Sequence, residues 1–240
     1  MAANFYVAPE QLMKDRAEYA RKGIARGRAL VAVAFAHGVV FAGENPSASL
    51  HKTSEIYDSI AFAAVGRYNE FEALRVAGIR LADVKGYQYA REDVTAKPLA
   101  NAYSQALGAS FMGETKPFEV ELLIAQVDGD RTPAADGADE AAVDSGLELF
   151  HILYDGSIVD EHHFVAIGGE TEPLRTELEG RFEEGMDRDQ AVRVAVGALS
   201  AVAGRTLSAE VLEVSGLDAR RPRRRFFRLE GEELAAVLTA

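Results

Sequence analysis

The sequence predicts an α+β fold of four layers, an αββα sandwich with an extra helix at the N-terminus. Two observations predict it. The apolar patterns run in the order helix, strands, helix pair, strands, helix pair, strands and helix along the 240 residues. Two sheets packed face to face, with a helix pair on each outer side, would bury every apolar face in that order.

The extra helix is predicted over residues 9–27. Pro9 suits the first helical turn, where its missing amide hydrogen is not needed, and Gly27 suits the exit. One side of the helix is apolar at helical spacing, with Met13, Ala17, Ala20 and Ile24. The opposite side is charged, so the helix is amphipathic.

The strands are predicted from short apolar runs. They cover residues 30–35, 38–44, 60–66, 118–127, 147–154, 157–161, 164–167, 209–215 and 224–229. A tight turn at Ala36-His37-Gly38 joins the first two strands, and Asp155-Gly156 makes a hairpin turn further along. The run 60–66 has no polar side chain, which indicates a buried strand.

Two helix pairs separate these strands. They are predicted over 67–92 and 95–112, and over 172–184 and 187–203, with a last helix from about residue 230. Thr95 is the expected N-cap of its helix. Asp187 and Gln190 have the spacing of a capping box, which satisfies free amide hydrogens at a helix start.

One segment, residues 128–146, is rich in Asp, Ala and Gly and poor in large apolar residues. That composition predicts an exposed, acidic and flexible loop between two strands of a hairpin. No domain boundary is needed there. We therefore expect residues 9–240 to form a single domain, preceded by a tail of residues 1–8.

Composition argues against several classes of function. The chain has no cysteine, which excludes disulfides, thiolate nucleophiles and thiolate metal ligands. A formal net charge of -12 argues against general affinity for nucleic acid. No apolar run approaches the roughly 20 residues that span a bilayer, and the first residues lack the pattern of a signal peptide. We expect a cytoplasmic protein without a metal, a cofactor or membrane contact.

The most informative stretch is residues 19–66. It begins in a basic helix end, Glu18-Tyr19-Ala20-Arg21-Lys22-Gly23-Ile24-Ala25-Arg26-Gly27, continues through the first two strands, and includes Leu50-His51-Lys52-Thr53-Ser54-Glu55-Ile56-Tyr57-Asp58. Together these residues resemble the α-type subunit of the proteasome, in particular its actinobacterial branch. The resemblance implies the N-terminal nucleophile hydrolase fold, which is a four-layer sandwich of the kind predicted above.

The resemblance also implies which chemistry is missing. In the active β type, a Thr exposed by cleavage after Gly attacks the substrate, and its own amine acts as the base. Here no Gly-Thr pair precedes the first strand, and the nucleophile position falls near Arg28. The acidic position falls at Glu44 and the lysine position at Lys52. A lysine and a carboxylate without a nucleophile cannot transfer an acyl group, so a non-catalytic subunit is expected; the alternative is an active threonine peptidase of the same fold.

Lys52 is the residue to which the resemblance assigns the clearest role. It stands six positions before Asp58, and the family's Lys at that place lines a pocket between neighbouring α subunits that receives the C-terminal carboxylate of an activator. A compact point charge suits a single terminal carboxylate. Gly27 falls beside the pocket, where a side chain would obstruct the incoming tail, and Leu12 is expected to add apolar contact. The alternative is that Lys52 pairs with Glu55 at a strand edge.

Residues 1–8 correspond to the family's gate, where tails from a heptameric ring converge and close the entry pore. Phe5, Tyr6 and Val7 are apolar enough to pack together there, next to Pro9 at the start of the helix. The alternative is a frayed terminus. The resemblance further implies the partners: other α subunits, proteasome β subunits, a hexameric AAA ATPase that docks through its C-terminal tail, and unfolded proteins, commonly tagged with a small ubiquitin-like protein.

The basic run Arg220-Arg221-Pro222-Arg223-Arg224-Arg225 leaves a second alternative, a nucleic-acid-binding module. The net charge and the strand that follows the run argue against it. A similar run belongs to the actinobacterial α type, so a solvated or interface-pairing segment is favoured.

Overall fold

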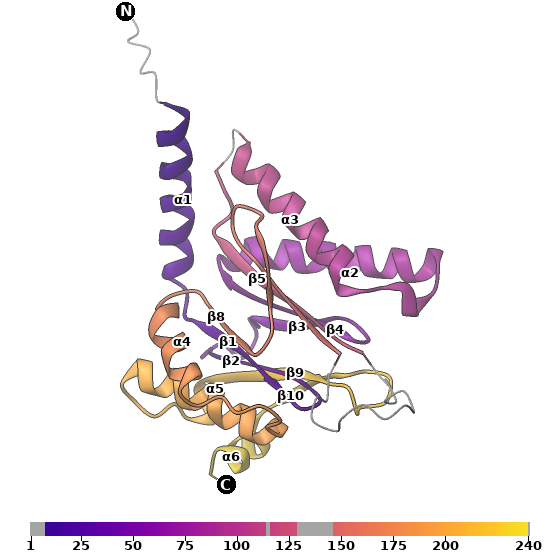
Figure 1. Ribbon diagram of the computed structural model, residues 1–240, viewed down its shortest axis with the longest axis vertical. Helices are drawn as coiled ribbons and strands as arrows, with labels where there is room; N and C mark the ends of the chain where they lie inside the picture. The colour runs from indigo at the N-terminus through magenta and orange to yellow at the C-terminus, as the bar shows by residue number, and fades with distance from the viewer. Residues whose placement is uncertain (1–7, 114–115, 129–145, 240) are drawn as a thin grey trace, which may run out of the picture.

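The computed structural model describes residues 8–113, 116–128 and 146–239. In these ranges two five-stranded sheets pack face to face, and helices cover the outer side of each sheet (Figure 1). Helix α1 (Pro9–Ala25) precedes the first strand and extends beyond the body of the sandwich. The predicted α+β sandwich with an extra N-terminal helix is confirmed.

Both sheets are antiparallel. The first has the order β10-β9-β2-β1-β8, with β1 (Leu30–Phe35), β2 (Gly38–Glu44), β8 (Phe164–Ile167), β9 (Leu212–Asp218) and β10 (Phe226–Leu229). The second has the order β3-β4-β5-β6-β7, with β3 (Thr53–Tyr57), β4 (Ile60–Gly66), β5 (Val120–Val127), β6 (Leu147–Ile152) and β7 (Ile158–Glu161). Each sheet therefore combines strands that are distant in the sequence.

Helices form the outer layers. The second sheet is covered by α2 (Tyr68–Gln88) and α3 (Ala96–Met112). The first sheet is covered by α4 (Thr171–Glu179), α5 (Arg188–Ala203) and α6 (Gly231–Thr239). Two short 3-10 helices, η1 (Arg91–Asp93) and η2 (Ala209–Val211), lie in the connections.

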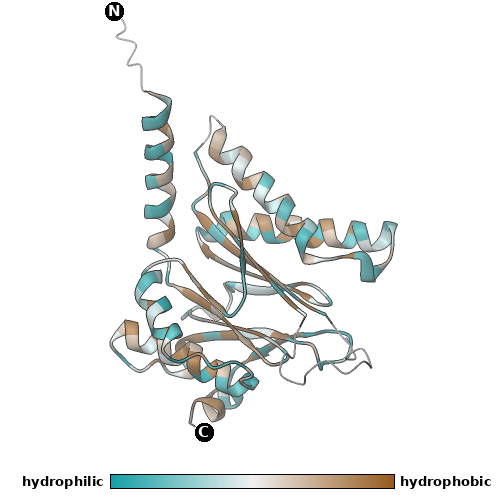
Figure 2. Cartoon of the chain, in the orientation of Figure 1, coloured by the Kyte–Doolittle hydropathy of each residue, from teal (hydrophilic) through white to brown (hydrophobic). Residues whose placement is uncertain are grey.

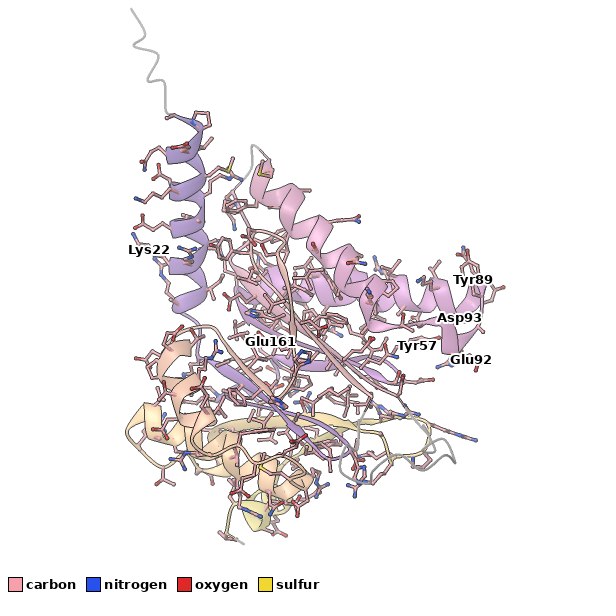
Figure 3. All side chains as sticks on the ribbon, viewed as in Figure 1. Lys22, Tyr57, Tyr89, Glu92, Asp93 and Glu161 are labelled. Carbon is pink, nitrogen blue, oxygen red and sulfur yellow. The ribbon has the colours of Figure 1, made fainter. Side chains whose placement is uncertain are left out.

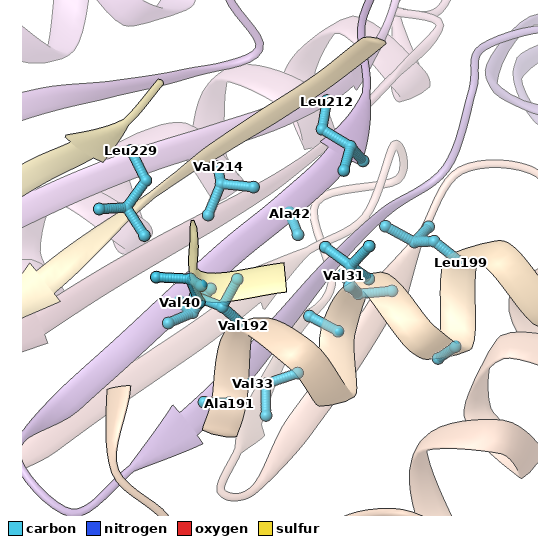
Figure 4. Packing of buried hydrophobic residues seen from close by; sticks show 14 of the residues in the cluster. Val31, Val33, Val40, Ala42, Ala191, Val192, Leu199, Leu212, Val214 and Leu229 are labelled. Atoms are coloured by element: carbon cyan, nitrogen blue, oxygen red, sulfur yellow. The ribbon is translucent and has the colours of Figure 1, made fainter. Parts of the chain in front are cut away.

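Strand periodicity builds the apolar layers. Alternate residues of a strand point to opposite faces, so Val39 and Phe41 of β2 lie between the sheets, where they belong to the same buried cluster as Leu123 of β5. Val40 faces the other way and packs in the cluster that contains Val192 of α5 (Figure 4). Figure 2 shows apolar residues concentrated on the strands, with hydrophilic residues along the outer sides of the helices.

Helix α1 joins the core through its C-terminal half. Ala20 and Ile24 are buried in the layer between the sheets. Further toward the N-terminus, the Arg16 guanidinium donates a hydrogen bond of 2.7 Å to the main-chain carbonyl of Phe111 at the end of α3. On the outer side Lys22 points away from the sheets (Figure 3). The body of the protein thus holds α1 at two places along its length.

The two predicted helix starts differ in how they are capped. Asp187 and Gln190 form the capping box, with two reciprocal hydrogen bonds of 2.8 Å each between the amide of one and the side chain of the other. Thr95 occupies the N-cap position of α3, but its side chain makes no capping bond. The side-chain oxygen of Gln126 accepts a hydrogen bond of 2.6 Å from the amide of Ala96. A residue distant in the sequence therefore caps α3.

Several elements differ from the sequence pattern. The helix predicted over 67–92 ends at Gln88, and η1 forms separately at Arg91–Asp93. β3 is not predicted because Thr53-Ser54-Glu55 is polar and a bulge interrupts the strand between Glu55 and Tyr57. The strand predicted at 209–215 lies at 212–218, since η2 takes its first residues and Gly216 continues the strand instead of ending it. The helix predicted over 172–184 ends at Glu179, directly before Gly180.

Candidate functional site

Lys52 lies immediately before β3, at the end of the sandwich where β1 begins and β2 ends. Its ammonium donates hydrogen bonds to the main-chain carbonyl of Arg28 at 2.7 Å and to that of Glu44 at 3.2 Å. Its own carbonyl accepts a hydrogen bond of 2.9 Å from the amide of Ala64. The side chain is half-buried, and this desolvation lowers the pKa of Lys52 to about 8, although the Glu213 carboxylate acts in the opposite direction.

The register of β1 and β2 brings Arg28 and Glu44 together. Leu30 pairs with Gly43, so the residues just outside this pair are neighbours at the same end of the hairpin. The Glu44 carboxylate lies 2.7 Å from the Arg205 guanidinium and 3.6 Å from that of Arg28. Glu44 is therefore bonded mainly by Arg205, and the Arg28 guanidinium is held less closely.

Glu55 does not pair with Lys52, the alternative that the sequence leaves open. Its carboxylate lies 2.5 Å from Nε of Arg224. The Lys52 ammonium is instead directed at the main-chain carbonyls of Arg28, just before β1, and of Glu44, at the end of β2. These are the residues at which the resemblance predicts the nucleophile and acidic positions.

The basic run 220–225 makes contacts within the chain. Arg224 pairs with Glu55, as described above. Arg220 lies 2.8 Å from the Asp218 carboxylate. Arg225 donates a hydrogen bond of 2.7 Å to the carbonyl of Val127. The contacts of Arg224 and Arg225 tie the turn between β9 and β10 to the second sheet; a solvated or interface-pairing role for the run stays a prediction.

A groove of about 290 Å³ is lined in part by Arg28 and Glu44, the two residues whose carbonyls bond the Lys52 ammonium. Its rim includes these two residues and Gly27. Its apolar lining comes from Leu174, Leu199, Val202 and Leu207. The groove thus combines an apolar wall with a charged, hydrogen-bonding rim.

Gly27 lies at this rim, two residues after the end of α1. Its amide donates a hydrogen bond of 2.9 Å to the carbonyl of Ile24, which closes the helix. A Cβ on Gly27 would lie 3.2 Å from the Ile24 carbonyl oxygen and 3.3 Å from the Gly66 amide nitrogen. The structure therefore places Gly27 on the groove, and Lys52 is connected to it through its bonds to Arg28 and Glu44; the role of both residues toward a bound tail stays a prediction.

Leu12 lies apart from this groove. It is 45% exposed on the N-terminal half of α1, and the 13 residue steps from Leu12 to the end of α1 at Ala25 correspond to about 20 Å along the helix axis. Pro9 is the first residue of α1, as predicted. The predicted gate residues Phe5, Tyr6 and Val7, and residues 129–145 of the predicted acidic loop, lie outside the described residues.

Arg28, where the resemblance predicts the nucleophile position, lies between α1 and β1. Arg26 is the C-cap of α1 and β1 begins at Leu30, so Arg28 is joined to both neighbours by peptide bonds. It has neither a free α-amine nor a hydroxyl, and its guanidinium only donates hydrogen bonds. The site can bind an anion, but Arg28 supplies no nucleophile for acyl transfer.

Glu213 is a site residue that the sequence does not single out. It lies on β9 between Leu212 and Val214, a pattern that fits an outward-facing polar position of a strand. It is 6% exposed, because the edge of the second sheet covers it. Nothing in the sequence around Glu213 indicates that the second sheet covers it.

Two further features bear on function. None of the helices in the described ranges has the length and apolar character that crossing a membrane requires. Within the same ranges, no cluster of three or more His, Asp or Glu side chains is arranged to hold a metal ion.

Comparison with known proteins identifies the family. The family described as "Proteasome subunit" matches residues 24–135 and 137–216. The chain is 52% identical to the "Proteasome subunit alpha" of Kineococcus radiotolerans, over 99% of this chain and 98% of the relative. It is 53% identical to that of Xylanimonas cellulosilytica, over 98% and 95%, and 51% identical to that of Acidothermus cellulolyticus, over 99% and 98%. The chain therefore belongs to the proteasome subunit family, in its α-type, actinobacterial branch.

Proposed function

We propose that this chain forms the gated outer rings of a proteasome core, takes no catalytic part itself, and receives the C-terminal tail of a ring-shaped ATPase at Lys52. In this proposal heptameric rings of the chain cap rings of β subunits, which supply the threonine nucleophiles. The substrates are unfolded proteins, delivered in the cytoplasm and tagged with a small ubiquitin-like protein.

The observation that carries the proposal is the hydrogen bond from the Lys52 ammonium to the carbonyl of Arg28, 2.7 Å long. In a catalytic relative the position of Arg28 would hold a threonine with a free amine and a hydroxyl. Here that position is an ordinary peptide unit between α1 and β1. The lysine and the carboxylate of the ancestral site remain, but their polar atoms bond the main chain and arginines. This supports a site that keeps its charged side chains but has no nucleophile.

The same geometry supports a docking role for Lys52. An ammonium that is partly removed from water attracts a single terminal carboxylate more strongly than one at an open surface. The resemblance implies an activator tail that ends in a hydrophobic residue, Tyr and any residue, and the apolar wall of the groove at Arg28 and Glu44 suits the first two of these. Since Leu12 lies about 20 Å along α1 from the helix end at Ala25, it would contribute to such a pocket from the neighbouring subunit of the ring.

The gate belongs to the same proposal. Residues 1–8 lead into α1, where Pro9 fixes the backbone direction at the first helical turn. Arg16 and the buried Ala20 hold that helix on the body of the protein. A tail that leaves a fixed helix can converge with its copies on a ring axis, where Phe5, Tyr6 and Val7 would pack together.

The experiment co-expresses the chain with its β partner and measures particle mass and peptide hydrolysis. We expect a large ring-stacked particle that is active only with β, and an intact mass for the α chain that excludes cleavage before β1. A core that lacks residues 2–8 should hydrolyse peptides faster. If it does not, the tail is not the barrier; if the α chain alone hydrolyses peptides, the non-catalytic assignment is wrong.

Docking is tested on the same particle with a fluorescent peptide that ends in a hydrophobic residue, Tyr and any residue with a free carboxylate. Lys52→Ala should weaken its binding by about a hundredfold, or ~2.8 kcal/mol, because the partner of the carboxylate is lost. Lys22→Ala is the matched control, since Lys22 lies on the exposed side of α1 and its one ion pair among the described residues is with Glu18, one turn earlier on the same helix. Equal binding by both variants would contradict the docking role.

A further inference from the structure

Glu213 on β9 accepts hydrogen bonds from the main-chain amides of Lys52 and Thr53 and from three side-chain donors. Its carboxylate accepts five hydrogen bonds. One oxygen accepts from the Lys52 amide at 2.9 Å and from the Asn45 side chain at 2.6 Å. The other accepts from the Thr53 amide at 3.0 Å, the Thr53 hydroxyl at 2.7 Å and the Arg228 guanidinium at 3.0 Å. An ionised carboxylate carries acceptors only, on two oxygens, so it can accept from several donors at once.

The position of Glu213 connects the two sheets at the groove. In the register of β9 with β2, Glu213 pairs with Gly43, the residue before Glu44. The main chain of Lys52 is held on one side by Glu213 and on the other by Ala64 of the second sheet. Glu213 bonds the main chain of Lys52, and the Glu44 carbonyl bonds its ammonium. These two glutamates therefore lie close together on the first sheet.

The carboxylate is ionised although it is buried. Burial raises the pKa of Glu213, but the hydrogen bonds described above outweigh this effect and the net shift is downward. The charged and titratable groups that face it are Lys52 before β3, Arg228 on β10, and His51, whose Nδ1 lies 3.7 Å away. Its negative charge also acts on the Lys52 ammonium and favours the protonated form.

We propose that Glu213 is the positioning residue for Lys52: it anchors the main chain of Lys52 to β9 and so holds the ammonium at the carbonyls of Arg28 and Glu44, on the rim of the groove. This inference rests on the proposed function, because positioning affects binding only if Lys52 receives the tail. Glu213 itself would not touch the tail.

Two variants separate the charge of Glu213 from its reach. Glu213→Gln keeps the length of the side chain and removes the charge. Glu213→Asp keeps the charge and withdraws it by one methylene, so that it no longer reaches both the Lys52 and the Thr53 amides. Glu210→Gln is the matched control, since it removes one negative charge from an exposed residue three positions earlier. All are prepared as particles with the β partner, and mass measurement verifies their assembly.

The first readout concerns Lys52 without any peptide. The lysines are methylated reductively with ¹³C-formaldehyde, and the Lys52 methyl signal, assigned by its loss in Lys52→Ala, is titrated by NMR. In Glu213→Gln the titration midpoint of Lys52 should move to lower pH, because the neighbouring negative charge is lost. In Glu213→Asp and Glu210→Gln it should stay near that of the unsubstituted protein.

The second readout is affinity for the free-carboxylate tail peptide. Both Glu213 variants should bind it about tenfold more weakly, which corresponds to ~1.4 kcal/mol, and Glu210→Gln should bind it normally. If both Glu213 variants keep the Lys52 midpoint and the affinity of the unsubstituted protein, Glu213 only packs the sheets together and the inference fails. If the unsubstituted protein does not bind the peptide, the docking proposal fails, and the titration alone then decides whether Glu213 sets the state of Lys52. Should Glu213→Gln not assemble, normal peptide affinity in Glu213→Asp would still overturn the inference.

Discussion

The phenol of Tyr103 on α3 fills the space that a side chain at Gly78 on α2 would need. A Cβ at Gly78 would collide with the Tyr103 hydroxyl and would lie 2.7 Å from the ring carbon that bears it. That hydroxyl is buried and has no hydrogen-bond partner among the described residues. The close approach of α2 to α3 over the second sheet therefore depends on a glycine, and Tyr103 gains only packing there.

Gly78→Ala should destabilise the chain by about 1–3 kcal/mol, because overpacking outweighs the better helix propensity of Ala. Urea unfolding of the isolated chain measures this. Tyr103→Phe alone should be close to neutral, since it removes a buried unpaired hydroxyl. In the double variant the loss should be smaller than the sum of the two single losses. Gly180→Ala is the control, because a Cβ there meets its nearest neighbours at ordinary distances of 3.7 and 3.8 Å; equal midpoints for both alanine variants would contradict the collision.

Tail binding should weaken as the pH rises through about 8, the pKa to which burial lowers Lys52. Below that pH the ammonium is charged and attracts the carboxylate; above it the free protein holds a neutral amine, and binding must take up a proton. Affinity should therefore fall toward about tenfold for each further pH unit. Fluorescence anisotropy between pH 6.5 and 9.5 measures this, with a C-terminally amidated peptide as control. A flat profile for the free-carboxylate peptide would show that Lys52 is not its partner.

Gly27→Ala should weaken tail binding more than it affects folding. The added methyl group would lie 3.2 Å from the Ile24 carbonyl oxygen, so the rim of the groove must shift by a few tenths of an ångström. We expect a decrease of several-fold in peptide affinity and a loss of less than about 1.5 kcal/mol in unfolding free energy. Anisotropy and urea unfolding on the same preparations separate the two effects, and Gly180→Ala should change neither. Unchanged affinity in Gly27→Ala would remove Gly27 from the binding surface.

His151 should make the fold less stable in mild acid. Burial lowers its pKa to about 4, whereas an unfolded His titrates near ~6.5. The unfolded chain therefore takes up this proton first, and stability should fall by about 1.4 kcal/mol for each pH unit between those values. Glu121 and Glu161 face the imidazole at 4.0 and 3.8 Å, and burial raises the pKa of each, so both oppose this trend at the acid end.

Urea unfolding of the isolated chain from pH 7 to pH 4.5 measures the slope for His151. His151→Gln removes the titrating group and should flatten the profile. His162→Gln is the control, because His162 is an exposed histidine in the turn between β7 and β8. If His151→Gln keeps the slope of the unsubstituted chain, other groups cause the acid sensitivity.

The sequence predicts this fold well wherever local chemistry decides the outcome. The run 60–66 becomes a central strand because its residues lack polar side chains, and Asp187 starts its helix because its partner Gln190 lies three residues away. Thr95 shows what local chemistry does not decide. Its place is predictable from propensity, but the bond that caps the helix comes from Gln126 on β5, and only the folded chain brings the two segments together.

The site divides in the same way. Lys52, Gly27 and the absence of a nucleophile at Arg28 are accessible from the sequence, because motif spacing fixes their places along the chain. Glu213 is not, since its role depends on the edge of the second sheet closing over β9. Leu12 shows a further limit: one chain places it far from Lys52, so its predicted contact depends on the geometry of a ring.

The burial of Ala20 and Ile24 in the layer between the sheets has a consequence for the timing of assembly. Catalytic members of this family expose their nucleophile by cutting the chain before the first strand. Here the same cut would remove Ala20 and Ile24 from the core, so we expect it to destabilise the fold. In our proposal this chain therefore reaches its working shape without cleavage, and only its β partners mature by it.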